Sequence, residues 1–351
     1  MQHNENIPSG LTRTITLWEK LRGENLFITG GTGLFGHWFL ENLVEANQFG
    51  NLDIRATVLT RNPIAFQQKA PELLLNTGIQ LHSGDITNFE FPKGEYSQIL
   101  HLATTSAIES FQGEEQLRKF HTLVNGTERV LQFAGYCGVK KVLFTSSGVA
   151  YGILPEGMQL ISEDYCGAPD TTQPNSALGQ AKRTAEYLCA YYADKYDFDY
   201  TIARCFSFVG PRLPLNLHYA IGNFIRDALW ADAITVKGDG TPVRSFLYMA
   251  DLVVWLLTLL VKGQSSRIYN VGSDQPITIR DLAYLIREIL CQDKPVQILG
   301  DTTHNIGHFA RNWYVPNIHR ARTELQLEVW TSLDEAIRKT AEAALLQEQK
   351  Q

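Results

Sequence analysis

The sequence predicts an α/β protein with a doubly wound parallel sheet and a smaller C-terminal α/β lobe. Three observations lead to this fold. Short apolar runs alternate with helical patterns over the first 205 residues, a glycine-rich turn follows the first of these runs, and the alternation becomes less regular from residue 206 onward. Alternation of this kind implies parallel strands joined by right-handed crossover helices, which then cover both faces of the sheet.

Each predicted element follows from hydrophobic periodicity. After a short tail, residues 11–22 carry apolar residues at helical spacing and predict an amphipathic helix. The predicted strands are residues 26–29, 54–60, 79–83, 99–103, 141–145 and 200–204, and the predicted helices are 34–45, 116–136, 175–196 and 332–351.

A glycine-rich turn joins the first predicted strand to the helix at 34–45. It reads Thr29-Gly-Gly-Thr-Gly-Leu-Phe-Gly36 and contains the GxGxxG spacing. Glycines let the backbone approach a pyrophosphate closely, and the helix N-terminus offers it free N–H groups. Because a strand precedes the turn and a helix follows it, the motif has its required context. The expected cofactor contacts here are Gly30, Gly33, Leu34, Phe35 and Gly36.

The glycine-rich turn indicates which part of the chain binds the cofactor, and the predicted domains follow from it. Residues 1–24 form an N-terminal tail with a short helix, and residues 25–205 form a Rossmann-like dinucleotide-binding domain. Residues 206–351 form a substrate-binding lobe, from which some segments return to the sheet. Ligands of such sheets bind at the carboxyl ends of the strands, so we expect the substrate in a cleft there.

The ends of the second and third predicted strands bear on the choice of cofactor. The second ends in Leu59-Thr60-Arg61-Asn62, without the acid that normally binds the ribose hydroxyls. Arg61 either meets the 2′-phosphate of NADP or is a solvated loop charge. Asp85, after the third strand, either accepts a hydrogen bond from the adenine amino group or is a turn aspartate. The expected cofactor is therefore NAD(P), with NADP favoured.

Several ordered motifs resemble those of the extended short-chain dehydrogenase/reductase family, the NAD-dependent epimerase/dehydratase group. Thr29–Gly36 resembles its TGxxGxxG loop, and His101-Leu-Ala103 resembles its HxA segment beside the nicotinamide. Thr145–Gly152 resembles its SSxxxYG motif and places Ser147 on the catalytic serine or threonine. The resemblance implies oxidation or reduction at C4 of a nucleoside-diphosphate hexose. It adds four residues to the expected cofactor contacts: Ile86, Leu102, Ala103 and Lys182.

The same resemblance suggests substrate contacts in the C-terminal part. Arg204–Pro211 resembles RxFNxYGP with Ser207 in place of asparagine, and Gly238–Ser245 resembles a segment in which Arg244 would contact the substrate diphosphate. Asn223 either binds phosphate or caps the following helix, and Arg311 is either a second diphosphate contact or a surface charge. The expected substrate-binding residues are Ser207, Asn223, Arg244 and Arg311, and a homodimer is expected.

The family's catalytic YxxxK motif is incomplete. Its register reads Leu178-Gly-Gln-Ala-Lys182, so leucine fills the tyrosine position. In the family, this tyrosine moves a proton as hydride transfers, and losing a general acid or base typically costs ~10²–10⁴-fold in rate. Leucine can neither ionise nor donate a hydrogen bond.

Three interpretations of Leu178 stay open. In the first, the proton has another carrier, namely Lys182 itself, Ser147 with a water, or Tyr151, because a desolvated lysine can act as a base. In the second, the chain is a degenerate homologue that binds cofactor or sugar nucleotide without turnover. In the third, Leu178 is a core residue of a shifted helix, with catalysis elsewhere. The first interpretation is our working prediction.

The residues after Ser147 bear on the reaction branch. The dehydratases of the family usually carry an acidic pair there, whereas this chain has Gly148-Val149. The sequence therefore favours an epimerase or reductase over a 4,6-dehydratase.

Bulk composition argues against several other classes of protein. The formal net charge is −6 and no long basic run occurs, so neither nucleic acid nor a membrane is expected as a partner. The five cysteines form no CxxC pair, and His304 and His308 lack a third ligand nearby, so no metal site is expected. The N-terminus lacks an apolar signal segment, and the apolar run Leu252–Val261 is about half of a ~20-residue span. A cytoplasmic protein is expected.

Overall fold

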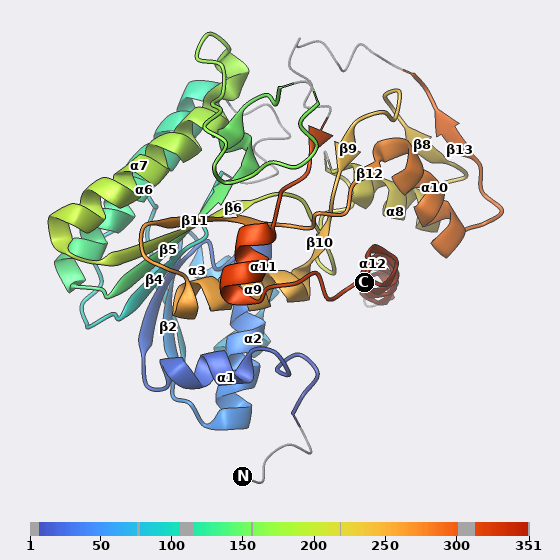
Figure 1. The fold of residues 1–351 in the computed structure, drawn as a ribbon. Helices are drawn as coiled ribbons and strands as arrows, with labels where there is room; N and C mark the ends of the chain where they lie inside the picture. The colour runs from blue at the N-terminus through green and yellow to red at the C-terminus, as the bar shows by residue number, and fades with distance from the viewer. Residues whose placement is uncertain are drawn as a thin grey trace.

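A seven-stranded parallel sheet forms the centre of the molecule, in the strand order β11-β6-β5-β4-β1-β2-β3 (Figure 1). The computed structural model describes residues 7–75, 78–105, 115–155, 157–217, 219–300 and 313–349. The order runs outward from β1 in both directions, so a crevice is expected where the winding reverses between β1 and β4. This order confirms the predicted doubly wound sheet. The strands are β1 (Asn25–Thr29), β2 (Arg55–Thr60), β3 (Ile79–Ser83), β4 (Gln98–His101), β5 (Lys141–Ser147), β6 (Asp199–Cys205) and β11 (Arg267–Val271).

Helices cover both faces of this sheet, and strand periodicity explains how. Successive side chains of a strand point to opposite faces. Phe27 of β1 therefore joins the core beneath α6 (Gln116–Cys137) and α7 (Ala177–Tyr196). Leu26 and Ile28 join the core on the other face. That face is covered by α2 (Leu34–Gly50) and α9 (Met249–Lys262), while α3 (Pro63–Lys69) and α4 (Pro71–Leu74) follow β2.

Helix α9 contains the most apolar run of the sequence, and that run is buried. Leu252, Leu256 and Leu259 are completely enclosed, and Trp255 donates a hydrogen bond from Nε1 to the Glu328 carbonyl at 3.0 Å. The apolar run is therefore a core helix beneath the sheet. Within the described ranges, no helix combines the length and apolarity needed to cross a membrane.

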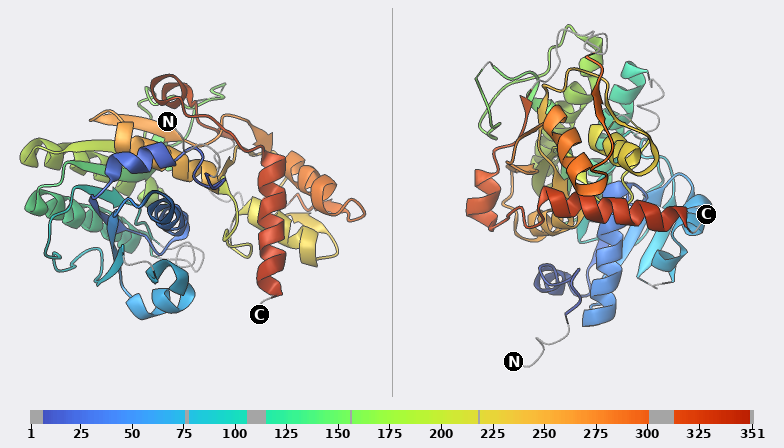
Figure 2. Two further views of the ribbon diagram at one scale, coloured as in Figure 1. Left: turned by 90° about the horizontal axis from the view of Figure 1, so that it is seen from below. Right: turned by 90° about the vertical axis from the view of Figure 1, so that its right-hand side faces the viewer.

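Most of the remaining C-terminal elements share a separate core. It is built by α8 (Ala220–Trp230), β8 (Ile234–Val236), α10 (Ile279–Leu290), β13 (Val296–Ile298) and α12 (Leu333–Glu348). Figure 2 shows α12 lying beside the other helices of this lobe. Short strand pairs connect the lobe to the sheet: β7 (Phe208–Val209) pairs with β10 (Leu247–Tyr248), and β9 (Val243–Arg244) pairs with β12 (Ile277–Thr278) and β14 (Trp313–Tyr314). Helix α11 (His319–Leu325) packs near β11.

Several predicted boundaries differ from the structure, such as that of α2, which runs on to Gly50, and for two of them the contacts show the reason. The helix predicted at 11–22 is a four-residue helix, α1 (Ile15–Trp18), followed by a 3-10 turn at Glu19–Leu21, and Trp18 ties it to α2 by a 2.8 Å hydrogen bond to Asn42. The strand predicted at 99–103 ends at His101. Beyond it, the backbone passes so close to Gly30 that a Cβ there would lie 2.6 Å from the Ala103 nitrogen.

Candidate active site

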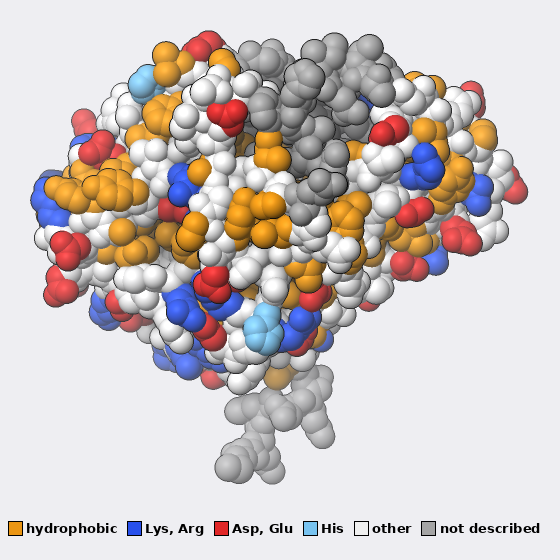
Figure 3. Space-filling model, turned by 45° about the horizontal axis from the view of Figure 1, so that its top comes forward, with side chains coloured by type: hydrophobic (Ala, Val, Ile, Leu, Met, Phe, Trp, Pro, Cys, Tyr) orange, Lys and Arg blue, Asp and Glu red, His pale blue; other side chains and the backbone are white. Residues whose placement is uncertain are grey.

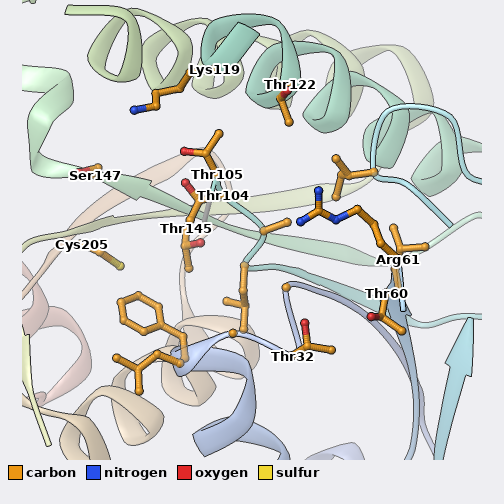
Figure 4. Close-up of a pocket in the computed structure, with 18 of the residues that line it drawn as sticks. Thr32, Thr60, Arg61, Thr104, Thr105, Lys119, Thr122, Thr145, Ser147 and Cys205 are labelled. Carbon is orange, nitrogen blue, oxygen red and sulfur yellow. The ribbon is translucent and has the colours of Figure 1, made fainter. Parts of the chain in front are cut away.

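A cavity of about 1150 Å³ lies at the carboxyl ends of the parallel strands (Figure 4). Its walls come from the β1–α2 turn, from the ends of β2 to β6, and from α6 and α7. Pockets for one small ligand typically measure ~300–1,000 Å³, so this cavity has room for an extended ligand such as a dinucleotide. The sequence-predicted cofactor residues that line it are Gly30, Gly33, Leu34, Phe35, Arg61, Asp85, Ile86, Leu102, Ala103 and Lys182.

A different structural constraint explains the glycine at each of the three motif positions. Gly30 has a φ of 69° and passes close to the backbone after β4, so a side chain there is excluded by the fold. Gly36 packs on the turn, where a Cβ would lie 2.3 Å from the Gly31 Cα. At Gly33 the nearest atom to an added Cβ would be the Gly30 oxygen at 3.3 Å. The glycine at position 33 is therefore explained mainly by the cavity, into which the α2 N-terminus opens.

Charged groups mark the end of the cavity beyond β2 and β3. Arg61 and Lys69 line it, and Arg61 extends along its wall in Figure 4. Asp85 accepts hydrogen bonds from the Thr87 nitrogen at 2.9 Å and the Thr87 hydroxyl at 2.6 Å. Partial burial raises the pKa of Asp85, but these bonds and the charge of Arg61 outweigh it and lower the pKa below the usual value. Asp85 is thus an ionised turn aspartate that also faces the cavity.

His101 lies behind the cavity wall, where its ring joins β1 and α6 through two hydrogen bonds. Its Nδ1 lies 2.7 Å from the Thr29 hydroxyl and its Nε2 lies 3.0 Å from the Thr127 hydroxyl. Burial and the charge of Lys182 lower the pKa of His101 to about 3, so the ring is neutral. This network fixes the end of β4, from which Leu102 and Ala103 reach the cavity.

Lys182 and Ser147 both line the cavity, and Ser147 lies on the side away from Arg61 in Figure 4. Lys182 is 3% exposed on α7, and its Nζ donates to the Thr145 carbonyl at 2.8 Å. Burial lowers its pKa to about 8, which gives an amine that can act as a base near neutral pH. Ser147 ends β5, and its hydroxyl accepts a hydrogen bond from the Val149 nitrogen at 3.3 Å. Both residues line the cavity.

Leu178 lines the same cavity, one helical turn before Lys182 on α7. Residues four apart on a helix share a face. The helix is therefore oriented so that position 178 faces the ligand space, which speaks against a shifted helix that hides Leu178 in the core.

Tyr151 occupies a structural position, away from the cavity wall. It is fully buried, its hydroxyl donates to Asn270 Oδ1 at 2.8 Å, and the Arg204 guanidinium lies 4.3 Å from its ring centre. Burial raises its pKa to about 12. Arg204 also pairs with the buried Glu186 at 2.6 Å, and Glu186 accepts a hydrogen bond from Ser146. The turn after β5 directs Tyr151 into this network, so the structure does not support it as a proton carrier.

Three of the predicted substrate residues, Ser207, Asn223 and Arg244, are absent from the described part of the cavity wall. Arg244 donates to its neighbour's carbonyl at 2.8 Å and lies 5.9 Å from the Tyr314 ring centre. Asn223 lies inside α8, where it accepts a hydrogen bond from Arg226 at 3.3 Å, and the N-cap position of α8 belongs to Tyr219. Asn223 is therefore not the helix cap.

Of the other two predicted substrate residues, Ser207 is described and Arg311 is not. Ser207 sits between Phe206 and Phe208, which both line the cavity. Arg311 lies outside the described residues, as do His304 and His308.

Several residues that line the cavity were not expected from the sequence. Lys119 is the one of these residues that the sequence could have indicated. Its position falls on the stripe of α6 whose later members Leu123, Thr127 and Val130 are buried. A lysine on such a stripe indicates a special environment. The other missed residues include Thr32, Thr104, Thr105, Arg118, Thr122, Thr145, Cys205, Phe206, Phe208 and Tyr219, which come from loops and strand ends.

A glycine loop opening into a large cavity at the strand ends defines a dinucleotide-binding α/β protein. A family model described as "NAD dependent epimerase/dehydratase family" matches residues 26–272. The chain belongs to this family, which confirms the resemblance read from the sequence.

Two curated relatives are similar to most of this chain. UDP-glucuronic acid decarboxylase 1 of Danio rerio is 27% identical over 90% of this chain and 72% of its own length. UDP-glucuronic acid decarboxylase 6 of Arabidopsis thaliana is 28% identical over 79% of this chain and 77% of its own length.

Among solved structures, an epimerase from Methanothermobacter thermautotrophicus has a TM-score of 0.80 at 22% identity, with 97% of each chain covered. UDP-glucuronic acid 4-epimerase from Bacillus cereus, solved with UDP-glucuronic acid and NAD, has a TM-score of 0.76 at 22% identity, covering 92% of this chain and 99% of that chain. These structures share the fold of this chain.

Proposed function

We propose that the chain is an NAD(P)-dependent enzyme that oxidises or reduces C4 of a nucleoside-diphosphate hexose. The observation that carries this proposal is one cavity that joins the glycine loop to Ser147 and Lys182. The named relatives are decarboxylases of UDP-glucuronic acid and 4-epimerases of UDP-sugars, which favours a UDP-linked hexose or hexuronic acid as substrate. When bound, the nicotinamide ring would supply the hydride acceptor or donor for C4.

Lys182 and Ser147 would move the proton in this reaction. The lowered pKa of Lys182 makes its neutral amine accessible near pH 8, and Ser147 lines the cavity at the same end. A proton leaving the C4 hydroxyl would pass through the Ser147 hydroxyl to Lys182, which keeps its place through the Thr145 carbonyl. This assigns the general-base role to lysine, because Leu178 has no group that can carry it.

The cations at the adenosine end favour NADP. Arg61 and Lys69 line the cavity beyond β2, where the usual ribose-binding acid is missing, and a guanidinium suits a phosphate through paired hydrogen bonds. We therefore propose that NADP binds at least as well as NAD.

The described lining residues also bear on the reaction branch. Asp85 is the one carboxylate among them, and it lies at the strand ends beside Arg61. A 4,6-dehydration needs an acid near the sugar, so the wall supports an epimerase or reductase better. Substrate contacts are proposed for Ser207, Asn223, Arg244 and Arg311, which would require the lobe to supply them from just outside the described wall.

A second candidate function is cofactor or sugar-nucleotide binding without turnover. The specific observation in its favour is Leu178, which presents an apolar side chain to the cavity in the position of the catalytic tyrosine. Such a chain would keep the glycine loop and lose the chemistry.

A homodimer through α6 and α7 is proposed as the assembly. Tyr136, Tyr187 and Tyr191 on these helices are 66%, 65% and 50% exposed. Hydrophobic side chains gather at the left edge of Figure 3, where α6 and α7 lie in Figure 1. Exposed apolar surface of this kind marks an interaction site. Light scattering should give a dimer for the wild type and a monomer for Tyr187→Asp, and a monomeric wild type would contradict the proposal.

The experiment that tests the function starts from the purified protein. Mass spectrometry of ligands released on denaturation should show a nicotinamide dinucleotide, a sugar nucleotide or both. The protein is then incubated with UDP-linked hexoses, hexuronic acids and their 4-keto forms in the presence of NAD or NADP. A change in product mass, product configuration or nicotinamide absorbance is expected. Failure to bind either dinucleotide by calorimetry would overturn the proposal.

A further inference from the structure

Glu186 is a buried carboxylate of α7 that joins three elements of the fold beside the cavity. It is 8% exposed and lies one helical turn after Lys182. Its carboxylate accepts two hydrogen bonds from the Arg204 guanidinium of β6, at 2.9 Å from Nε and 2.6 Å from Nη2. One of its oxygens also accepts a hydrogen bond from the Ser146 hydroxyl of β5. The buried charge is therefore compensated within the chain, by a bidentate ion pair and a hydroxyl donor.

The register of the sheet explains why these groups meet. Ser146 and Arg204 are direct neighbours on the paired strands β5 and β6, so their side chains leave the same face of the sheet, which is the face that α7 covers. Successive side chains of a strand alternate between faces, so those of Thr145 and Ser147 leave the other face. The hydrogen bond from Ser146 to Glu186 therefore ties α7 to the strand end that also carries Thr145 and Ser147.

This strand end carries two groups of the proposed reaction. The Thr145 carbonyl accepts the 2.8 Å hydrogen bond from Lys182 Nζ, and Ser147 lines the cavity. A shift of β5 along α7 would lengthen the bond to Lys182 and displace the Ser147 hydroxyl at the same time. Misplacing a reacting group by ~1 Å can cost ~10²-fold in rate. The contact between β5 and α7 therefore bears directly on turnover.

The charge of Glu186 also acts on Lys182. Burial lowers the pKa of Lys182 to about 8, and the nearby carboxylate works in the opposite direction by favouring the ammonium form. Burial raises the pKa of the two neighbouring thiols and lowers that of the neighbouring imidazole, so these groups are neutral. The titratable groups around Lys182 are Glu186 and Cys189 of α7, Cys205 of β6, His101 of β4 and, beyond Glu186, Arg204 of β6.

We propose that Glu186 is a positioning residue of the reaction, which holds the end of β5 against α7 through Ser146. In this position the Thr145 carbonyl receives Lys182, and Ser147 faces the ligand. The inference rests on the function proposed above. The described part of the cavity wall does not include Glu186, so it acts through the two residues that move the proton and itself transfers none.

The variant Ser146→Ala tests the positioning contact, because it removes the donor to Glu186 and keeps the buried ion pair with Arg204. With a sugar nucleotide that the wild type converts, kcat should fall ~10-fold or more, while KM and the melting temperature change little. Ser146→Thr, which keeps the hydroxyl, should restore most of the rate. The kcat of the wild type in Ser146→Ala would overturn the proposal.

The variant Glu186→Gln tests the charge. It leaves the Arg204 guanidinium buried without its counter-charge, so the melting temperature should fall, and the measurements are made below the unfolding transition. Competitive labelling with a trace of acetic anhydride, followed by mass spectrometry, gives the pKa of the Lys182 amine without requiring turnover. The labelling profile of Lys182 should move to lower pH by ~1 unit, and kcat for the oxidation should move with it. An unmoved labelling profile would reduce Glu186 to a structural residue and overturn the proposal.

The matched control is Glu128→Gln. Glu128 is a half-buried carboxylate of α6 that accepts a 2.9 Å hydrogen bond from the Tyr192 hydroxyl, so it also ties α7 to a neighbouring element. Its kcat and its labelling profile at Lys182 should equal those of the wild type. A control that loses kcat as Ser146→Ala does would mean that any loosening of α7 has this effect, which would overturn a specific role of Glu186.

The failure of the proposed function has its own signature. A wild type that converts no sugar nucleotide overturns the function and the positioning role together. A wild type that turns over while Ser146→Ala keeps its full kcat overturns the role of Glu186 alone. If Glu186→Gln fails to fold, Ser146→Ala and Ser146→Thr still decide, because both keep the ion pair with Arg204.

Discussion

The two ends of the cavity are built in different ways, one by a continuous backbone motif and the other by side chains from separate elements. At the glycine-loop end, backbone atoms and the N-terminus of α2 create the binding surface, and the whole motif is contained in eight consecutive residues, Thr29–Gly36. At the reacting end, the surface is made by side chains from three separate elements: Ser147 of β5, Leu178 and Lys182 of α7, and Lys119 of α6. The glycine loop at the first end resembles the family's motif, whereas the sequence register that we propose for the second end puts leucine at position 178 where the family has tyrosine.

This difference shows that binding and chemistry can be lost separately. A pyrophosphate is held mainly by backbone N–H groups, which any residue provides once glycines allow the approach. Proton transfer needs one titratable side chain at one place. The following substitutions therefore act on one end of the cavity and leave the other intact.

The largest expected effect belongs to Lys182. Lys182→Met should lower turnover by ~10²–10⁴-fold, the usual cost of losing a general base, with NAD(P) binding retained. Turnover and calorimetry on the same preparation measure both quantities. A variant that loses dinucleotide binding and activity together would mean that the two ends are not separable.

The pH dependence sharpens this assignment. Because burial lowers the pKa of Lys182 to about 8, its neutral, proton-accepting form increases as the pH rises through 8. For the direction in which a sugar hydroxyl is oxidised, kcat should rise with pH and level off above about pH 8. A stopped-flow pH profile that is flat from pH 6 to 9 would remove Lys182 from the base role.

The next effect is at the glycine loop. Gly33→Val should weaken NAD(P) binding by ~100-fold or more, because the side chain displaces the pyrophosphate from charge-assisted N–H contacts. The melting temperature should fall less than for a substitution of Gly36, since an added Cβ at Gly33 would make one tight contact, 3.3 Å from the Gly30 carbonyl oxygen. Gly36→Ala provides the contrast: its Cβ would collide with the Gly31 backbone, so it should destabilise the fold by about 1–3 kcal/mol. Reversed outcomes for the two variants would contradict the division of roles among the glycines.

A smaller effect is expected at Arg244. Its proposed contact with the substrate diphosphate predicts that Arg244→Ala raises the dissociation constant of the UDP-sugar roughly 10-fold or more, as a charge-assisted hydrogen bond would. NAD(P) affinity should not change. An unchanged sugar-nucleotide affinity would contradict a contact between Arg244 and the diphosphate.

The smallest effect is expected at Arg61, which is exposed at the rim. Arg61→Ala should weaken NADP by ~10-fold or less, since solvent screens an exposed charge, and should leave NAD almost unchanged. Calorimetry with both dinucleotides measures the selectivity. Equal losses for the two would show that Arg61 does not contact the 2′-phosphate.

What the sequence predicts follows the same division. The strand periodicity around β1 and the glycines of its turn predict the sheet and the dinucleotide site, because both depend on local patterns. The end of β4 and the short α1 escape prediction because tertiary contacts with Gly30 and α2 decide them.

The residues of the reacting end come from distant parts of the chain, so local sequence patterns predict only some of them. Ser147 and Lys182 are predicted by motif and do share the cavity wall. Tyr151, in the Thr145–Gly152 motif, is predicted as an alternative proton carrier, but contacts with Asn270 and Arg204 hold it in the core. Lys119 lies 63 residues before Lys182 in the chain, and only the packing of α6 beside α7 reveals that both enter one cavity.

The proposal that Lys182 carries the proton, with leucine at position 178, is tested most directly by comparing three forms of the protein. Wild type, Lys182→Met and Leu178→Tyr are incubated with UDP-linked hexoses, hexuronic acids and their 4-keto forms, and nicotinamide absorbance and product mass are followed. We expect turnover by the wild type, its loss in Lys182→Met, and little gain or some interference in Leu178→Tyr. Turnover that survives Lys182→Met, or that occurs only in Leu178→Tyr, would contradict it.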